Sequence, residues 1–377
     1  MGPRLTRRHF IAATASGAAL SACAPAASPG GADVPQTGAQ WEREWNELLA
    51  AARKEGKLAV ISIFSQGSRR RIYETYEDAF GIPVEESSFT SLSAFTPRVA
   101  EEQKAGIFTW DVGLLSGSRG ITLLRDAGNA DPIRPLLFRP DATDDAAWRD
   151  GFDAGFPDKE KQWGYCPGFD VSAHVWVNTD LVREGELRTA RDLLDPKWKG
   201  KMVLADVRSG YTSLPATAMR LTYGEDFLKQ LFVDQQPTYS RDDRLITESM
   251  VRGRNPIATG IPQSILDEFQ AQGLGKNIKQ VRLSDIVYGQ LGAPVSVLRN
   301  PPHPNAAKLF VNWVLTKEGQ TVFSQSTLQN SRRLDVPPSN PANYPEPGVK
   351  VERIFGTEAL IEEQFKTEKI LVDLVQK

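Results

Sequence analysis

Hydrophobic and polar positions alternate with two different periods along the chain from residue 41 onward. Between Trp41 and Ala52 the apolar residues recur at helical spacing, which predicts an amphipathic helix that ends at Gly56. The unbroken apolar run Leu58–Phe64 predicts a buried strand. Further strands are expected at 83–89 and 110–115, and helices at 68–80, at 94–104 and from residue 118. Strands that alternate with helices at this spacing indicate a parallel sheet built from βαβ units.

The alternation stops between residues 132 and 168, where Pro, Asp and aromatic residues are frequent and no period is evident. We expect this stretch to cross one lobe as a long irregular excursion. Val171–Val177 then predicts a strand with its valines on one face. Beyond it, strands are expected at 201–206, 256–260, 278–283 and 293–298, and helices at 212–223, 242–252, 263–272 and 357–375, with others capped by Thr189 and opened by Pro304. The second half therefore predicts a second α/β lobe.

The first 40 residues have the composition of a targeting segment followed by a tether. Arg7 and Arg8 form a twin-arginine pattern before a mildly apolar stretch that is shorter than the ~20 residues needed to cross a bilayer. Leu20–Cys23 resembles the lipobox of bacterial lipoproteins, whose cysteine is acylated by chains such as palmitate. We expect a signal peptide at 1–22, lipidation of Cys23 and a flexible tether at 23–40; a chance cysteine in an ordinary signal peptide is the alternative.

These features predict a protein held by a lipid anchor alone on the outer face of the cytoplasmic membrane or in the periplasm. The 377 residues are enough for two domains and carry a formal net charge of −2. Without the three signal-peptide arginines, 42 basic residues face 47 acidic ones, a net charge of −5, which gives no basic surface for nucleic acid. If Cys23 is lipidated, Cys166 is single and no disulfide is expected; otherwise a bridge between the two is open.

Several segments together resemble the extracellular solute-binding proteins of ABC importers, in the branch that includes ferric-ion, thiamine and phosphonate binders. They are Ala51–Leu58, Asp195–Lys201 with the following Arg208–Gly210, His303–Lys308 and Thr316–Gln320. The resemblance implies a periplasmic-binding-protein type II fold, in which crossover strands join two α/β lobes around a ligand cleft. It further implies a monomer without cofactor or catalytic residue, whose partners are a small solute, a permease and its ATPase.

On this resemblance, lobe 1 is expected to comprise 41–172 plus 288–326, and lobe 2 to comprise 173–287 plus 327–377. The first crossing is placed near Gly168–Val177 and the return near Tyr288–Leu298. The hinge is expected near Gly168 and Gly289–Gly292, and its motion would close the cleft over the solute.

Three predicted loops follow a strand, contain small residues and open a helix. Free N–H groups at helix starts, hydroxyls and glycines suit a small anion. A single loop of this kind is better explained as an ordinary helix N-cap, whereas three at the strand ends of this family favour a ligand role. The loops supply the candidate ligand residues Ser65, Gln66 and Gly67; Ser116, Gly117 and Ser118; and Arg208, Ser209, Gly210, Tyr211 and Thr212.

Two arginines and two tyrosines complete the candidate site. Arg208 and Arg241 are candidate clamps for carboxylate or phosphate-type oxygens. Tyr211 and Tyr288 are candidates to offer a ring face or a hydroxyl, with packing as the alternative for each. The sequence therefore predicts capture of a small, anionic, organic solute.

Metal binding and catalysis are the competing hypotheses. The ferric binders of the family use adjacent tyrosines, and this chain has no adjacent pair; the segment where it would lie is Thr259–Gln263. A ferric-ion-binding transport protein is kept as the alternative, although no metal site is expected. A secreted hydrolase is the second alternative, but Gly-x-Ser-x-Gly and His-Glu-x-x-His are absent, and His174 and His303 are interpreted as structural. No catalytic residue is expected.

Overall fold

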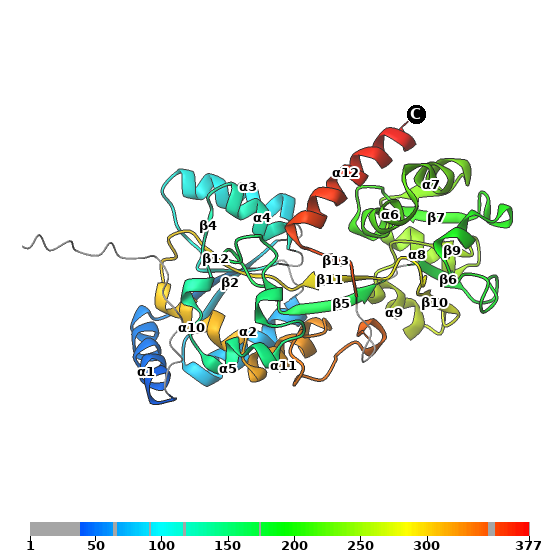
Figure 1. Ribbon diagram of the computed structural model, residues 1–377. Helices are drawn as coiled ribbons and strands as arrows, with labels where there is room; N and C mark the ends of the chain where they lie inside the picture. The colour runs from blue at the N-terminus through cyan, green and yellow to red at the C-terminus, as the bar shows by residue number, and fades with distance from the viewer. Residues whose placement is uncertain are drawn as a thin grey trace, which may run out of the picture. The chain divides into compact units, whose positions relative to one another are not determined.

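Figure 1 shows the computed structural model of the chain, which describes residues 38–62, 66–89, 92–115, 118–172, 175–345 and 351–376. The predicted signal peptide, the lipidation of Cys23 and the tether up to residue 37 lie outside the described residues. Among the helices of the described ranges, none has both the length and the apolar character that crossing a bilayer requires.

The first sheet has the strand order β2-β1-β3-β12-β4. Its first three strands in the chain are parallel, and helices connect them as the alternating pattern predicts. The sheet lies in a large apolar core that includes Val60, Val112 and Val297. The strands are β1 (Leu58–Ser62), β2 (Val84–Ser88), β3 (Val112–Leu114), β4 (Ala130–Asp131) and β12 (Val295–Leu298); the connecting helices are α2 (Gln66–Phe80), α3 (Leu92–Lys104) and α4 (Arg119–Asp126).

Two helices far apart in sequence pack together beside this sheet. They are α1 (Gly38–Glu55) and α10 (Pro304–Val314). The carboxylate of Glu55 accepts hydrogen bonds from the backbone N–H groups of Asn305, at 3.1 Å, and Ala306, at 2.8 Å, which would otherwise lack partners at the start of α10. Pro304 stands at the first position of its helix, as predicted.

The second sheet has the order β10-β6-β9-β7-β8, with β7 parallel to both β8 and β9. Its core is separate from that of the first sheet. Gly224, at a φ of 86°, follows the last residue of α6, as predicted. The elements are β6 (Val175–Asn178), β7 (Met202–Ala205), β8 (Thr238–Ser240), β9 (Ile257–Ala258) and β10 (Ile278–Val281), with α6 (Gly210–Tyr223), α7 (Glu225–Lys229), a π-helix (Gln230–Asp234), α8 (Asp243–Val251) and α9 (Gln263–Ala271).

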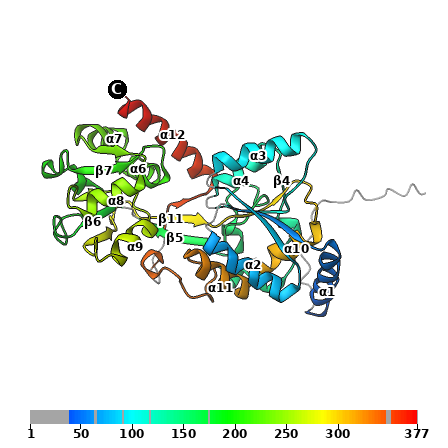
Figure 2. The same cartoon turned by 180° about the vertical axis from the view of Figure 1, so that it is seen from behind.

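A third, three-stranded sheet contains the predicted crossing strands. In it β11 (Tyr288–Gly292) pairs antiparallel with β5 (Gly168–Ser172) and parallel with β13 (Ile354–Phe355), and β5 and β11 run side by side in both views (Figures 1 and 2). A Cβ atom on Gly289 would lie 2.4 Å from the Phe169 ring, so this strand requires glycine there.

The predicted continuous strand Val171–Val177 was wrong. Val171 belongs to β5 in the third sheet, whereas Val175 begins β6 in the second. Both strands are buried along most of their length, so the spacing of the valines in the sequence does not reveal that the two strands belong to different sheets.

The irregular stretches are built from short helices and one long connection. Residues 132–168 contain α5 (Pro140–Thr143) and 3₁₀ turns at 134–136, 145–147 and 152–155, as the missing period predicts. After α11 (Lys317–Thr327) the chain runs irregularly to residue 345 and ends in α12 (Glu358–Val375), which packs on α6.

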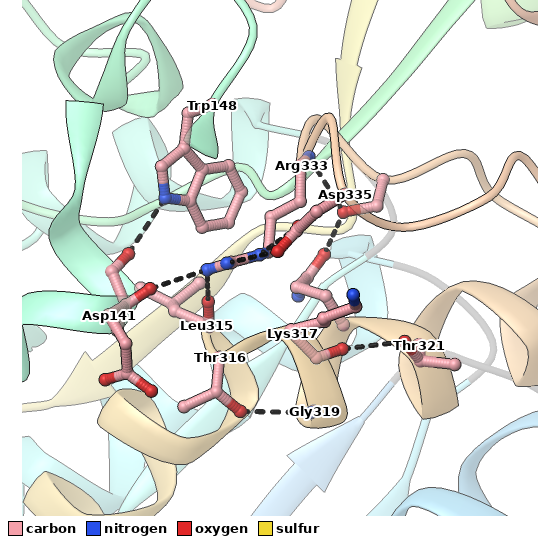
Figure 3. A network of polar contacts seen from close by, with 12 residues as sticks. Asp141, Trp148, Leu315, Thr316, Lys317, Gly319, Thr321, Arg333 and Asp335 are labelled. Atoms are coloured by element: carbon pink, nitrogen blue, oxygen red, sulfur yellow. Dashed lines mark hydrogen bonds and ion pairs between the residues drawn. The ribbon is translucent and has the colours of Figure 1, made fainter. Parts of the chain in front are cut away.

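Two buried arginines hold the connection at residues 328–345 against the irregular stretch at residues 132–168. Arg333 donates to the backbone oxygens of Asp141, at 2.8 Å, and Leu315, at 3.1 Å, and pairs with Asp335, while its guanidinium lies over Trp148 (Figure 3). Arg332 donates to the Tyr165 hydroxyl at 3.2 Å. We therefore propose that residues 328–345 belong with lobe 1, whereas the other predicted lobe boundaries stay predictions.

Candidate ligand-binding site

One edge of the second sheet collects most of the described candidate residues. Because β7, β8 and β9 are parallel, their carboxyl ends lie at the same edge, and α6, α8 and α9 follow there. Open α/β sheets bind ligands at this kind of edge. Arg208 and Ser209 follow β7, Arg241 follows β8, and Thr259 follows β9.

A carboxylate that the sequence analysis did not single out joins the two predicted clamps. Asp206 accepts the Nε–H of Arg208 on Oδ1, at 3.1 Å, and the Nε–H of Arg241 on Oδ2, at 2.8 Å. Partial burial raises the pKa of Asp206, but the hydrogen bond from Arg241 and the two positive charges outweigh it, and the pKa lies below its ordinary value. Arg208 and Arg241 are therefore neighbours although 33 positions separate them in the chain.

The turn into α6 exposes backbone at its tip. The Ser209 hydroxyl accepts a hydrogen bond from the backbone N–H of Tyr211, at 3.3 Å. Ser209 is therefore an ordinary helix N-cap, the alternative explanation for a loop of this kind. Nothing lies within 4 Å of the position that a Cβ atom on Gly210 would take, so the backbone there is open to approach. Tyr211 is partly exposed, and burial of its hydroxyl and the charge of Asp243 raise its pKa.

Thr212 and Thr259 support this turn through buried hydrogen bonds. The Thr212 hydroxyl is fully buried and donates to the backbone oxygen of Ala205, at 2.9 Å. It also lies 3.1 Å from the Thr259 hydroxyl. Since its one proton is used inside the protein, Thr212 supports the loop; its predicted contact with a ligand stays a prediction.

The loops of the first sheet are described only in part. Ser65, Ser116 and Gly117 lie outside the described residues. Gln66 and Gly67 open α2, where Gly67 is exposed. Ser118 precedes α4, but its side chain makes no capping bond and is buried next to Gly356.

Tyr288 opens the crossing strand β11, and its side chain belongs to the apolar core of the second sheet. Its ring is fully buried and meets that of Phe355 edge-on, with 4.9 Å between the centroids. Burial raises the pKa of Tyr288, and a hydrogen bond with Ser172 opposes that rise. These contacts favour the packing alternative, and a ligand role for Tyr288 stays a prediction.

The described residues offer little to a metal ion. Within the described ranges, no group of three or more His, Cys, Asp or Glu side chains is arranged to hold one. The hydroxyls of Tyr165 and Tyr239 bond to backbone oxygens, at 3.1 Å and 2.6 Å, and that of Tyr223 bonds to Asp285. His303 Nδ1 lies 2.8 Å from Asp111, whose carboxylate also accepts the His303 N–H, and these contacts favour the structural interpretation of this histidine; His174 lies outside the described residues.

The chain resembles known proteins in part of its sequence and over most of its structure. No family model matches the chain. A protein of Haemophilus influenzae named "Uncharacterized protein" is 34% identical over 155 residues, which is 38% of this chain and 43% of that protein, so the match spans less than half of the relative.

Solved structures match over most of the chain. Iron-bound HitA from Pseudomonas aeruginosa has a TM-score of 0.61 at 16% identity, over 84% of this chain and 99% of its own. IdiA (FutA) from Trichodesmium with iron and citrate has 0.67 at 15%, over 85% and 100%. AfuA from Actinobacillus pleuropneumoniae with fructose-6-phosphate bound has 0.58 at 19%, over 85% and 99%. The chain therefore has the predicted α/β fold of type II periplasmic binding proteins.

Proposed function

We propose that the chain is the substrate-binding component of an ABC import system. It captures a small, anionic, organic solute and delivers it to a membrane permease and its ATPase. A lipid on Cys23 anchors it outside the cytoplasmic membrane, and it acts as a monomer without chemistry of its own. The main support for the proposal is that Arg208 and Arg241 both bond to Asp206 near the start of α6, at the carboxyl ends of the parallel strands.

Electrostatics supports an anionic solute at this edge. Two guanidiniums share one carboxylate there, so the three side chains together carry a net positive charge. The N-terminal turn of α6 adds backbone N–H groups with partial positive charge. Half or more of each arginine side chain is exposed, so a solute can reach both.

A ferric-ion-binding role is the main alternative, because the matched HitA and IdiA (FutA) structures contain iron. The absence of adjacent tyrosines in this sequence argues against it. The fructose-6-phosphate in the matched AfuA structure shows that the same fold also holds an organic anion. A secreted hydrolase, the second alternative, has no support from the motifs of the sequence.

The crossing strands support a hinge. Gly168 and Gly292 stand opposite each other in the β5–β11 pair, and a Cβ atom on Gly168 would lie 3.0 Å from the Gly292 carbonyl oxygen. We propose that backbone rotation at this pair closes the lobes on the solute and presents the closed form to the permease.

A melting screen of the purified chain tests the proposal. The compounds are phosphonates, sugar phosphates, carboxylates, thiamine, polyamines and ferric salts. A solute at about 100 times its dissociation constant adds about 2.7 kcal/mol to the free energy of unfolding, which raises the melting temperature by a few degrees. We expect such a rise with an organic anion. A rise with ferric salts alone, together with a visible charge-transfer band, would establish the ferric alternative, and turnover of ester or glycoside substrates would establish the hydrolase.

A further inference from the structure

We propose that Asp206 is a positioning and specificity-determining residue, which sets Arg208 and Arg241 side by side to bind a phosphate monoester in preference to a carboxylate. This inference rests on the proposed function, which leaves the kind of anion open. Asp206 was not among the candidates from the sequence, and it touches both arginines.

The contacts of Asp206 decide which donors remain for a ligand. Each arginine gives its Nε–H to a different oxygen of the carboxylate. Oδ1 also accepts the backbone N–H of Arg208, at 3.0 Å, which fixes the carboxylate to the loop. Across the described part of the chain, the structure gives the Nη groups of both arginines no partner. The shared carboxylate therefore orients both guanidiniums and leaves their outer ends available.

Two guanidinium ends match phosphate better than carboxylate. A carboxylate has two oxygens, and a single guanidinium satisfies both through a bidentate pair of hydrogen bonds. A phosphate monoester has three terminal oxygens and a charge of about −1.5 to −2 at neutral pH. It can therefore occupy both arginines and still accept an N–H from the α6 turn.

The acidic residues nearby restrict where that charge can lie. Asp242 directs its carboxylate to the N–H groups of Arg244, at 2.9 Å, and Leu245, at 3.0 Å, so the start of α8 compensates its charge. The charge of Asp243 acts on Tyr211 and opposes an anion beside that ring. The phosphate is thus confined to the Arg208–Arg241 side, and Asp243 and Tyr211 are left to meet an uncharged, hydroxyl-bearing part of the solute.

The test compares two probes on the purified full chain by titration calorimetry. Fructose 6-phosphate supplies a phosphate monoester, and glucuronate supplies a carboxylate on a sugar of similar size. We expect the natural chain to bind fructose 6-phosphate at least tenfold more tightly than glucuronate. Asp206→Asn, which keeps the size of the side chain and removes its charge, should reduce that preference at least fivefold, because the arginines are no longer held together.

A second variant keeps the test decisive if Asp206→Asn fails to fold. Asp206→Glu retains the charge but moves the carboxylate by one methylene away from the position that accepts both Nε–H groups, and it should lose the same preference. Asp234→Asn, at an exposed acid that pairs with Lys229, is the matched control and should leave the preference unchanged.

The outcomes separate this inference from the proposed function. An unchanged preference in folded Asp206→Asn would overturn the role of Asp206 while leaving anion capture intact. Equal or tighter binding of glucuronate by the natural chain would overturn the assignment of a phosphate monoester, again without touching the import role. Binding of neither probe would overturn this inference, and the melting screen then decides separately whether another solute is captured.

Discussion

Two arginine clusters in this molecule differ in their surroundings, and the difference separates a structural role from the binding role that we propose. Arg332 and Arg333 are 1% and 4% exposed and donate hydrogen bonds to backbone oxygens, a hydroxyl and Asp335. Figure 3 shows the contacts of Arg333. The side chains of Arg208 and Arg241 are 52% and 76% exposed and share one carboxylate. The first pair fixes a connection of the chain, whereas the second keeps donors available for another molecule.

The largest expected effect is a loss of stability when Arg333 is removed from the buried cluster. Arg333→Ala leaves the carbonyl oxygens of Asp141 and Leu315 without this donor and Asp335 without its partner. A hydrogen bond from a charged group contributes about 1.5–3 kcal/mol, and Arg333 makes two to carbonyl oxygens, so urea unfolding should show a decrease of about 3–6 kcal/mol. Arg208→Ala serves as the control and should change the free energy of unfolding by less than about 0.5 kcal/mol, as exposed pairs do. Equal losses in the two variants would contradict the distinction.

A carboxylate next to the buried cluster gives a smaller, pH-dependent effect. Burial raises the pKa of Asp170 to about 6, although hydrogen bonds from Asn330 oppose the rise. The unfolded pKa is about 3.9, so the stability that this group contributes is present below about pH 4 and is lost as the pH rises through 6. Asp170→Asn should therefore raise the free energy of unfolding at pH 7.5 by about 3 kcal/mol and change it little at pH 4.

Urea unfolding of this variant and of the natural chain at both pH values measures the difference. A variant that is less stable than the natural chain at pH 7.5 would show that Asp170 is stabilised as an anion, contrary to the direction of its pKa.

Replacement of Arg208 should change stability least and ligand binding most clearly. Arg208→Ala should weaken binding of an anionic solute at least tenfold, or about 1.4 kcal/mol, without lowering the melting temperature of the free protein. Arg244→Ala is the matched control, because Arg244 lies in α8 close to Arg241 in sequence but pairs with Glu268 instead of Asp206. Titration calorimetry that finds equal affinities in the two variants would remove Arg208 from the site.

Regular helices and strands could be predicted from the sequence, whereas contacts between distant segments could not. The periodic elements were predicted well, such as α12, expected at 357–375 and found at Glu358–Val375. Arg208 and Arg241 were singled out from their places before predicted helices. Asp206, which joins them, was missed because its contact with Arg241 exists only once β7 and β8 lie side by side, and pairing of strands that are distant in sequence leaves no local pattern.

The connection after α11 was beyond prediction for a related reason. Residues 328–345 have no period, and their path depends on Arg332 and Arg333 reaching residues more than 160 positions earlier in the chain. A signal was present in the form of two adjacent arginines within an otherwise irregular stretch, but a solvated pair and a buried pair look the same in sequence.

A crystal structure of the chain soaked with fructose 6-phosphate tests the central claim most directly. Our account predicts phosphate oxygens within about 3 Å of Nη atoms of both Arg208 and Arg241, with Asp206 still bonded to both side chains. A phosphate bound anywhere else on the protein, with these two arginines facing only solvent, would contradict it.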